Sequence, residues 1–212
     1  MKQNHVYALI IYFGVVILGD VITLIFNNPR SLVIILNFTL SPLLLLITLY
    51  LLRDDIKLMV FEKRKSTVKQ SIYAIIKWFF IAIVGFIVIA TITPLFYKSE
   101  VSNSSKMTQA IPLIVIPFVF IAPILEELIF RRIIFASFSK KFTILLSIIF
   151  TSVIFAGWHM TLPSFPLLFW LSIVYTYSYY QTNRLLVPIT LHILWNLFSS
   201  SVALIGALLE DH

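Results

Sequence analysis

Residues 121–135 read Ile-Ala-Pro-Ile-Leu-Glu-Glu-Leu-Ile-Phe-Arg-Arg-Ile-Ile-Phe, an apolar run that two adjacent glutamates, Glu126 and Glu127, interrupt. At the depth of a bilayer, a charged side chain costs about 2.5–3.5 kcal/mol on insertion scales. Membrane proteins keep such side chains where they face a protein-lined or water-containing interior and have partners. The two glutamates are therefore the first candidates for a functional site.

The composition of the whole chain indicates an integral membrane protein. Of the 212 residues, 60% are hydrophobic and 12% are charged, and the mean hydropathy is +1.00. Soluble domains have about 45–50% apolar and about 25% charged residues. The chain has no cysteine, which excludes disulfides, thiol nucleophiles and cysteine-ligated zinc. Its net charge of +7 lies mainly in short loops between apolar runs, so it indicates membrane orientation and not nucleic-acid binding.

Apolar runs of about 20 residues are long enough to cross a bilayer as helices. The runs lack the alternation of a barrel strand, so we predict an all-α polytopic transmembrane bundle with about seven spans, within a range of six to eight. No internal repeat or long linker divides the chain, so residues 1–212 are expected to form a single integral membrane domain. The predicted spans are 6–26, 31–52, 71–96, 108–130, 142–161, 165–181 and 186–208.

Basic residues are concentrated in alternate loops, which predicts the orientation of the chain. They gather at 53–70, at 131–141 and at Arg184, whereas the other loops carry few. The excess of lysine and arginine in cytoplasmic loops places the N-terminus in the cytoplasm. The segment 53–70 is interpreted as a solvated connector that faces lipid headgroups. The residue usage, rich in Ile, Phe and Lys and poor in Ala, favours a bacterial plasma membrane.

The glutamate pair predicts a division of roles on one helix. Glu127 and Arg131 are four residues apart, so they share a face of an α-helix and are expected to pair. Glu126 is turned about 100° away from that face, and is expected to point into the site. Pro123 has no backbone N–H, so it frees a carbonyl upstream and favours a kink there.

Two further polar clusters lie in later spans: Phe155-x-x-x-His159 and His192-x-x-x-Asn196. A carboxylate with a neighbouring imidazole can deprotonate a water molecule, and a histidine with an asparagine can donate to the oxyanion that forms when water attacks an amide. Alternatively, Glu126, His159 and His192 bind a metal such as zinc, and the metal activates the water. A lone histidine in an apolar span is more often an interhelical packing residue; three clusters in this order favour a functional site.

The ordered set Glu126-Glu127-x-x-x-Arg131, Phe155-x-x-x-His159, His192-x-x-x-Asn196 resembles the CAAX protease and bacteriocin-processing family, also called the Abi family. These proteins are intramembrane endopeptidases. The resemblance covers about residues 108–200, which would form the catalytic-type core.

The resemblance implies a role for each matching residue. Glu126 would be the catalytic carboxylate and His159 its partner in activating water, whereas His192 and Asn196 would stabilise the oxyanion. Glu127 and Arg131 would support the site. The family has been described both as metalloproteases and as metal-independent glutamate proteases. The chain lacks His-Glu-x-x-His and has no cysteine, so we favour a mechanism without a cofactor, with zinc as the alternative.

Two other functional classes compete with the endopeptidase. The first is a non-catalytic membrane protein, such as a self-immunity factor or scaffold, that binds a peptide or partner in the same cavity. The second is a small proton-coupled transporter, which would require repeats or paired broken helices that the sequence does not contain. The expected substrate is a peptide or membrane protein, which the sequence does not identify further.

A count of residues along each span places the two internal histidines at different depths. At about 1.5 Å per residue, His159 lies near the outer end of its span and His192 lies nearer the inner end of its own. Straight spans would hold these side chains apart. If both act in one site, this linear estimate must be wrong.

Overall fold

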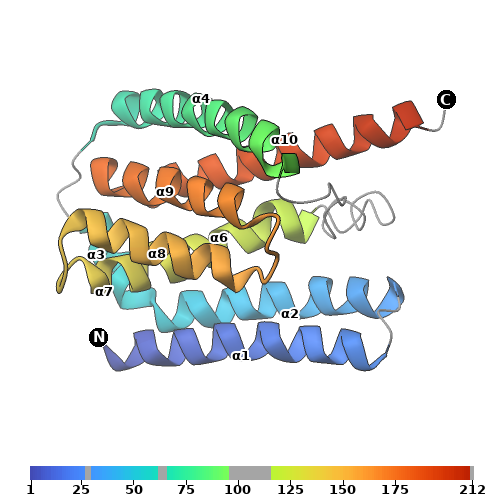
Figure 1. The fold of residues 1–212 in the computed structure, drawn as a ribbon. Helices are drawn as coiled ribbons and strands as arrows, with labels where there is room; N and C mark the ends of the chain where they lie inside the picture. The colour runs from blue at the N-terminus through green and yellow to red at the C-terminus, as the bar shows by residue number, and fades with distance from the viewer. Residues whose placement is uncertain (27–29, 62–65, 96–115, 211–212) are drawn as a thin grey trace. The chain divides into compact units, whose positions relative to one another are not determined.

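The computed structural model describes residues 1–26, 30–61, 66–95 and 116–210, and the regular elements in these ranges are all helical (Figure 1). The prediction of an all-α membrane bundle is thereby confirmed. The elements are α1 (Gln3–Ile25), α2 (Arg30–Leu51), α3 (Arg53–Phe61), α4 (Val68–Ile92), the 3-10 turn η1 (Thr93–Leu95), the π-helix η3 (Pro117–Ile121), α6 (Ala122–Glu127), the π-helix η4 (Leu128–Phe135), α7 (Ala136–Phe138), α8 (Ile144–Trp158), α9 (Phe165–Thr182) and α10 (Leu186–Glu210).

Each predicted span corresponds to helix in the described residues, although residues 108–115 of the fourth span lie outside them. Within the described residues, three helices are long and apolar enough to cross a membrane: Gln3–Ile25, Leu32–Leu51 and Val68–Leu95. The apolar helices Ile144–Trp158 and Leu186–Val202 are shorter. The total of seven spans stays a prediction.

The interpretation of 53–70 as a connector is wrong for its first half, because Arg53–Phe61 forms the helix α3. Asp54 and Asp55 lie in its first turn, where a negative charge is favourable at a helix N-terminus. This local stabilisation allows a charged, weakly apolar segment to be helical. The basic residues at 63–65 lie outside the described residues.

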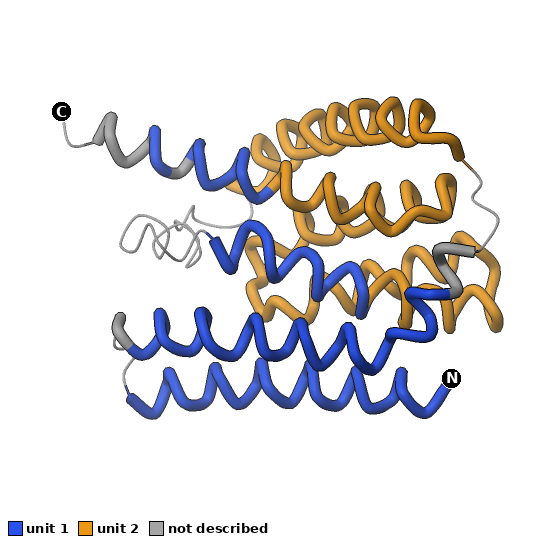
Figure 2. The backbone as a smooth tube through the Cα atoms, turned by 180° about the vertical axis from the view of Figure 1, so that it is seen from behind, with its two compact units in different colours: residues 1–63, 104–129, 196–212 blue, residues 64–103, 130–195 orange. Residues whose placement is uncertain are grey.

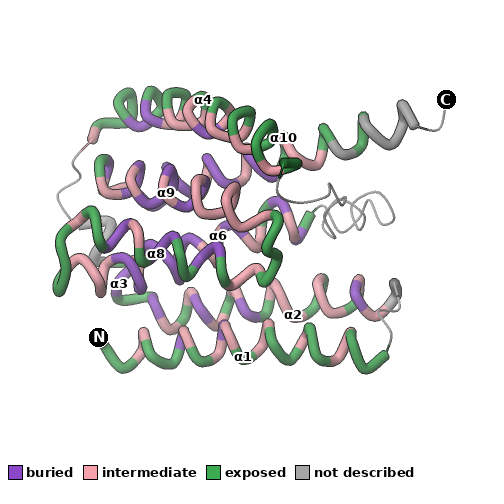
Figure 3. The backbone as a smooth tube through the Cα atoms, in the orientation of Figure 1, coloured by how far each residue is buried: buried purple, intermediate pink, exposed green. Residues whose placement is uncertain are grey.

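The chain forms two compact units, each assembled from segments that are far apart in the sequence (Figure 2). The first unit comprises residues 1–63, 104–129 and 196–212, and the second comprises 64–103 and 130–195. In the first unit α1 packs along α2, and α2 also contacts η3 and α6. In the second unit α9 packs against both α4 and α8. Many residues of α4, α1 and α2 are exposed (Figure 3), and large hydrophobic residues are among them, as expected for lipid-facing helices.

Small side chains allow the helices of the second unit to approach closely. Ser147, Thr151 and Ser152 of α8 and Ser172 and Thr176 of α9 are all buried. The hydroxyls of Thr151 and Thr176 each donate at 2.7 Å to the carbonyl four residues earlier in their own helix. Their hydrogen-bonding capacity is thus satisfied locally, so these residues pack as small groups between helices.

The contact between α4 and α9 depends on a glycine. A Cβ atom built on Gly85 would collide with the indole ring of Trp170. Glycine therefore occupies this position because the indole lies directly against the α4 backbone. Gly14 of α1 is different, because nothing lies within 4 Å of an added Cβ there.

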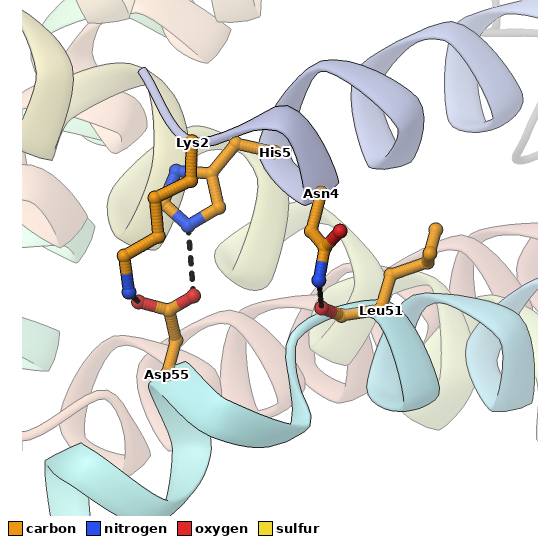
Figure 4. Close-up of polar contacts among 5 residues, drawn as sticks. All are labelled: Lys2, Asn4, His5, Leu51 and Asp55. Atoms are coloured by element: carbon orange, nitrogen blue, oxygen red, sulfur yellow. Dashed lines mark hydrogen bonds and ion pairs between the residues drawn. The ribbon is translucent and has the colours of Figure 1, made fainter.

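A polar cluster ties the start of α1 to the junction of α2 and α3 (Figure 4). Asp55 accepts a hydrogen bond from Lys2 Nζ at 3.0 Å and contacts His5 Nε2 at 2.8 Å, and Asn4 Nδ2 donates to the carbonyl of Leu51 at 3.3 Å. Burial by itself would raise the pKa of Asp55, but the hydrogen bonds and positive charges of His5 and Lys2 outweigh it. The pKa of Asp55 is therefore lowered from its ordinary value of 3.8.

We expect Gly85→Ala to lower the stability of the protein by about 1–2 kcal/mol, because the indole of Trp170 must move to accept the methyl group. Thermal unfolding in detergent measures this effect. Gly14→Ala is the matched control and should be neutral or stabilising by up to about 1 kcal/mol, since alanine is the better helix former. An equal or more stable Gly85→Ala protein would show that α4 does not pack on Trp170 in this way.

We expect Asp55→Asn to destabilise the protein by about 1 kcal/mol at neutral pH through the loss of a charge-assisted cluster. Because the folded-state pKa of Asp55 is lowered, its contribution is fully present above the ordinary value and is lost as the pH falls through the lowered pKa. Unfolding temperatures of the two proteins should therefore converge in acid. The neighbouring Asp54→Asn exchange, at an exposed position, is the control, and an equal effect of the two would contradict a specific role of Asp55.

Candidate active site

The helix that carries the glutamates changes from α-helical to π-helical directly after Glu127. Glu126 and Glu127 end α6, and the π-helix η4 begins at Leu128. Glu127 is completely buried, whereas Glu126 is partly exposed. A π-helix forms i→i+5 hydrogen bonds and therefore holds more residues in each turn than an α-helix. The four-residue spacing of Glu127 and Arg131 thus does not fix a shared face here, and their pairing stays a prediction.

Arg131 is fully buried and is bound by side chains of the second unit. Its Nη2 donates to the hydroxyl of Ser172 at 3.0 Å and lies 3.4 Å from the carbonyl of the same residue. The guanidinium carbon lies over the ring of Phe155, 4.8 Å from its centroid, and 5.4 Å from that of Tyr175. A buried guanidinium requires such hydrogen bonds and ring faces, because its desolvation is otherwise costly. Arg131 therefore joins η4 to α8 and α9.

The ring of Phe155 lies at the centre of an aromatic cluster, formed by Phe130, Phe155, Tyr175, His159 and His192. Its centroid is 5.0 Å from that of Phe130, 4.9 Å from that of His159 and 6.0 Å from that of His192. Both internal histidines therefore contact one side chain.

The expectation that straight spans hold the two histidines apart is consequently wrong, because both rings contact Phe155. Helix α8 has 15 residues, so it is about 22 Å long, shorter than the hydrocarbon core of about 30 Å. His159 caps the C-terminal end of this short helix. Its position at the end of α8 therefore does not require it to lie near the outer surface.

The backbone fixes the tautomer of neutral His159. Its Nδ1 lies 2.8 Å from the carbonyl oxygen of Phe155, one turn earlier in α8. A carbonyl only accepts hydrogen bonds, so Nδ1 carries the proton in this contact. In the neutral imidazole, Nε2 then holds the lone pair. That nitrogen is the one able to accept a proton or to ligate a metal.

Asn196 of α10 binds a backbone carbonyl that Pro123 leaves without a helical donor. The N–H of Ala122 bonds to the carbonyl of Pro117, five residues earlier. In this π-helical register the donor for the carbonyl of Phe118 would be residue 123, and proline has no N–H. Asn196 Nδ2 donates to that carbonyl at 3.1 Å instead. The carbonyl that Pro123 frees is therefore that of Phe118, and its hydrogen-bond donor is Asn196.

The candidate residues thus fall into two groups. Arg131, His159 and His192 meet in the aromatic cluster of the second unit, whereas Glu126, Glu127 and Asn196 belong to the first. The convergence of all of them on one reaction stays a prediction. Among the residues that the structure describes, no group of three or more histidine, cysteine, aspartate or glutamate side chains is arranged to hold a metal ion. The preference for a metal-free mechanism is a prediction that requires experiment.

Sequence reasoning missed the contribution of α9, in particular Ser172 and Tyr175. Both are buried, and both contact Arg131. The signal was present: Tyr175, Thr176 and Tyr179 lie three, four and seven residues after Ser172, which is the spacing of one helix face. A polar face on a predicted span indicates contact with other polar groups.

Comparison with known proteins identifies similar chains. Residues 108–198 match the family described as type II CAAX prenyl endopeptidase Rce1-like. YdiL of Bacillus subtilis (strain 168), whose name describes a candidate membrane peptidase, is 32% identical over 161 residues, which cover 73% of this chain and 65% of YdiL. The membrane-embedded CAAX protease MroQ of Staphylococcus aureus (strain USA300) is 29% identical over 154 residues, covering 64% of this chain and 61% of MroQ. The chain thus spans less than two thirds of either relative, and no solved structure matches it.

We expect Asn196→Ala to lower the stability of the protein by about 1 kcal/mol, because the carbonyl of Phe118 loses its donor. The loss should be smaller in a Pro123→Ala background, since residue 123 then has an N–H of its own. A double-mutant cycle of thermal unfolding measures this coupling. Strict additivity of the two exchanges would contradict the proposed link between Pro123 and Asn196.

Proposed function

We propose that this protein hydrolyses a peptide bond within or beside the membrane, because residues 108–198 match the family described as type II CAAX prenyl endopeptidase Rce1-like. The proposed catalytic residues are Glu126, His159, His192 and Asn196, with Glu127 and Arg131 supporting them. The substrate would be a membrane-associated peptide or a membrane-protein segment. We further propose that the protein resides in a bacterial plasma membrane, with its N-terminus in the cytoplasm.

The reaction assigns one task to each polar side chain. Glu126, assisted by Nε2 of His159, accepts a proton from water, and the water oxygen attacks the carbonyl carbon of the scissile amide. His192 and Asn196 donate hydrogen bonds to the oxyanion of the tetrahedral intermediate. The carbon–nitrogen bond then breaks, and the amine leaves with the proton that the base had accepted.

One observation supports this assignment above the others: two histidines from different helices contact the same phenylalanine. Phe155 lies 4.9 Å from the ring of His159 and 6.0 Å from that of His192. Residues kept only for helix packing need no such shared neighbour, whereas the proposed site requires the imidazole that assists Glu126 and the imidazole that donates to the oxyanion near one reacting bond. The bound Nδ1 of His159 leaves the lone pair on Nε2, which supports the role of Nε2 in assisting Glu126.

The contact of Asn196 is compatible with an oxyanion role. A carboxamide has two N–H donors. One binds the carbonyl of Phe118, which fixes the orientation of the amide group, and the second N–H would serve the oxyanion. Asn196 would therefore both stabilise the π-helical segment and take part in the reaction.

The test is cleavage of candidate peptides by the purified protein in detergent or proteoliposomes. Suitable peptides are a prenylated CAAX sequence, its unprenylated form and hydrophobic bacterial leader sequences. We expect the wild type to cleave at least one of them, and Glu126→Gln or His159→Ala to lower kcat by about 10²–10⁴, the usual contribution of a general base. Glu126→Gln keeps the size of the side chain, so a folded and inactive variant identifies the carboxylate itself.

Three further measurements separate the alternatives. Unchanged turnover in either variant would remove the role assigned to that residue. A wild type that binds the peptides and cleaves none would favour the non-catalytic self-immunity or scaffold class. Activity that a chelator removes and zinc restores would replace the proposed metal-free mechanism by metal activation of the water.

A further inference from the structure

The imidazole of His192 contacts two aromatic rings from different helices. Tyr175 of α9 is 1% exposed, and its ring stacks on His192 with centroids 4.9 Å apart and planes inclined by 24°. The edge contact with Phe155 of α8 is inclined by 69°. The plane of the imidazole is thus defined from α8 and α9, although His192 itself belongs to α10.

The helix that carries His192 does not fix this plane by itself. The second side-chain torsion of histidine is broad, so an imidazole on a helix can rotate about its Cβ–Cγ bond. A hydrogen bond weakens steeply when its donor angle falls from above 150° toward 120°. An imidazole that donates to an oxyanion therefore needs a neighbour that prevents this rotation.

We propose that Tyr175 is a positioning residue that sets the ring plane of His192. The inference deepens the proposed function and rests on it, because it concerns the role of His192 as an oxyanion donor. The flat face of the tyrosine ring performs this task, because it is the face that stacks on the imidazole. Preorganised donors of this kind stabilise a transition state without reorganisation at the moment of reaction.

Tyr175 is itself held in place by Arg131. The guanidinium carbon lies over the tyrosine ring at 5.4 Å, and the same guanidinium binds the hydroxyl of Ser172, one turn earlier in α9. A cation over one aromatic ring and a hydrogen bond to the same helix fix the position of that ring. Arg131 thereby supports His192 through Tyr175, which gives its predicted supporting role a physical path.

Tyr179 provides a matched control for the alternative, in which Tyr175 only fills the core. It lies one turn later on the same face of α9 and is also buried. Its ring contacts Phe135, with centroids 6.2 Å apart. The Tyr179→Leu exchange also removes a buried tyrosine ring from α9. It does so one turn away from the residue that stacks on His192.

The experiment measures kcat, KM and thermal unfolding for the wild type, Tyr175→Phe, Tyr175→Leu and Tyr179→Leu on the peptide that the wild type cleaves. We expect Tyr175→Leu to lower kcat about 10–100-fold with little change in KM, since a misaligned donor acts on the transition state. Tyr175→Phe should retain most of kcat because it keeps the ring. Tyr179→Leu should lower the unfolding temperature about as much as Tyr175→Leu and leave kcat within about threefold of the wild type.

The outcomes separate this inference from the proposed function. Cleavage by the wild type together with normal kcat in Tyr175→Leu overturns the positioning role only. Equal losses of kcat in Tyr175→Leu and Tyr179→Leu, or failure of Tyr175→Leu alone to fold, also overturn it, because the ring would then be structural. A wild type that cleaves none of the peptides overturns the proposed function and this inference together.

Discussion

A completely buried guanidinium is the constraint on which the second unit depends. Arg131 is fully buried among apolar residues. Its charge is stabilised by the hydroxyl of Ser172 and by the ring faces of Phe155 and Tyr175. Aliphatic side chains at those positions would leave the charge desolvated, at a cost of several kcal/mol. The requirement explains why aromatic and hydroxyl side chains from α8 and α9 gather at one place. Two of the same aromatic rings also contact the histidines, so support of the charge and orientation of the imidazoles share one set of side chains.

The π-helical winding around the glutamates has a second, independent consequence. Pro123 removes an N–H, and the five-residue register of η3 assigns the loss to the carbonyl of Phe118. Asn196 supplies the missing donor from a segment 78 residues away in the sequence. A broken backbone hydrogen bond in a membrane helix is tolerated only where another group replaces it. The same break that weakens the helix therefore determines where one polar residue of α10 binds.

Peptide hydrolysis in a membrane needs donors and acceptors whose directions are fixed before the substrate arrives. His159 acquires such a direction from the backbone carbonyl of Phe155, which sets its tautomer. His192 acquires it from stacking on Tyr175, and Asn196 from the carbonyl of Phe118. Each polar group is oriented by a neighbour that takes no part in the proposed bond cleavage. These contacts give each group the fixed direction that the proposed bond cleavage requires.

The sequence by itself determined the helical membrane class, the approximate limits of the helices and the three motifs, because apolar length and residue spacing are local properties. It could not place α3, whose stability comes from a favourable first turn and from contacts of Asp55 with Lys2 and His5. It also expected straight spans to hold His159 and His192 apart, whereas both rings contact Phe155. Ser172 and Tyr175 gained their significance only from the tertiary structure. Which side chain meets which depends on helix length, π-helical register and the packing of helices distant in sequence, and none of these is fixed by local hydropathy.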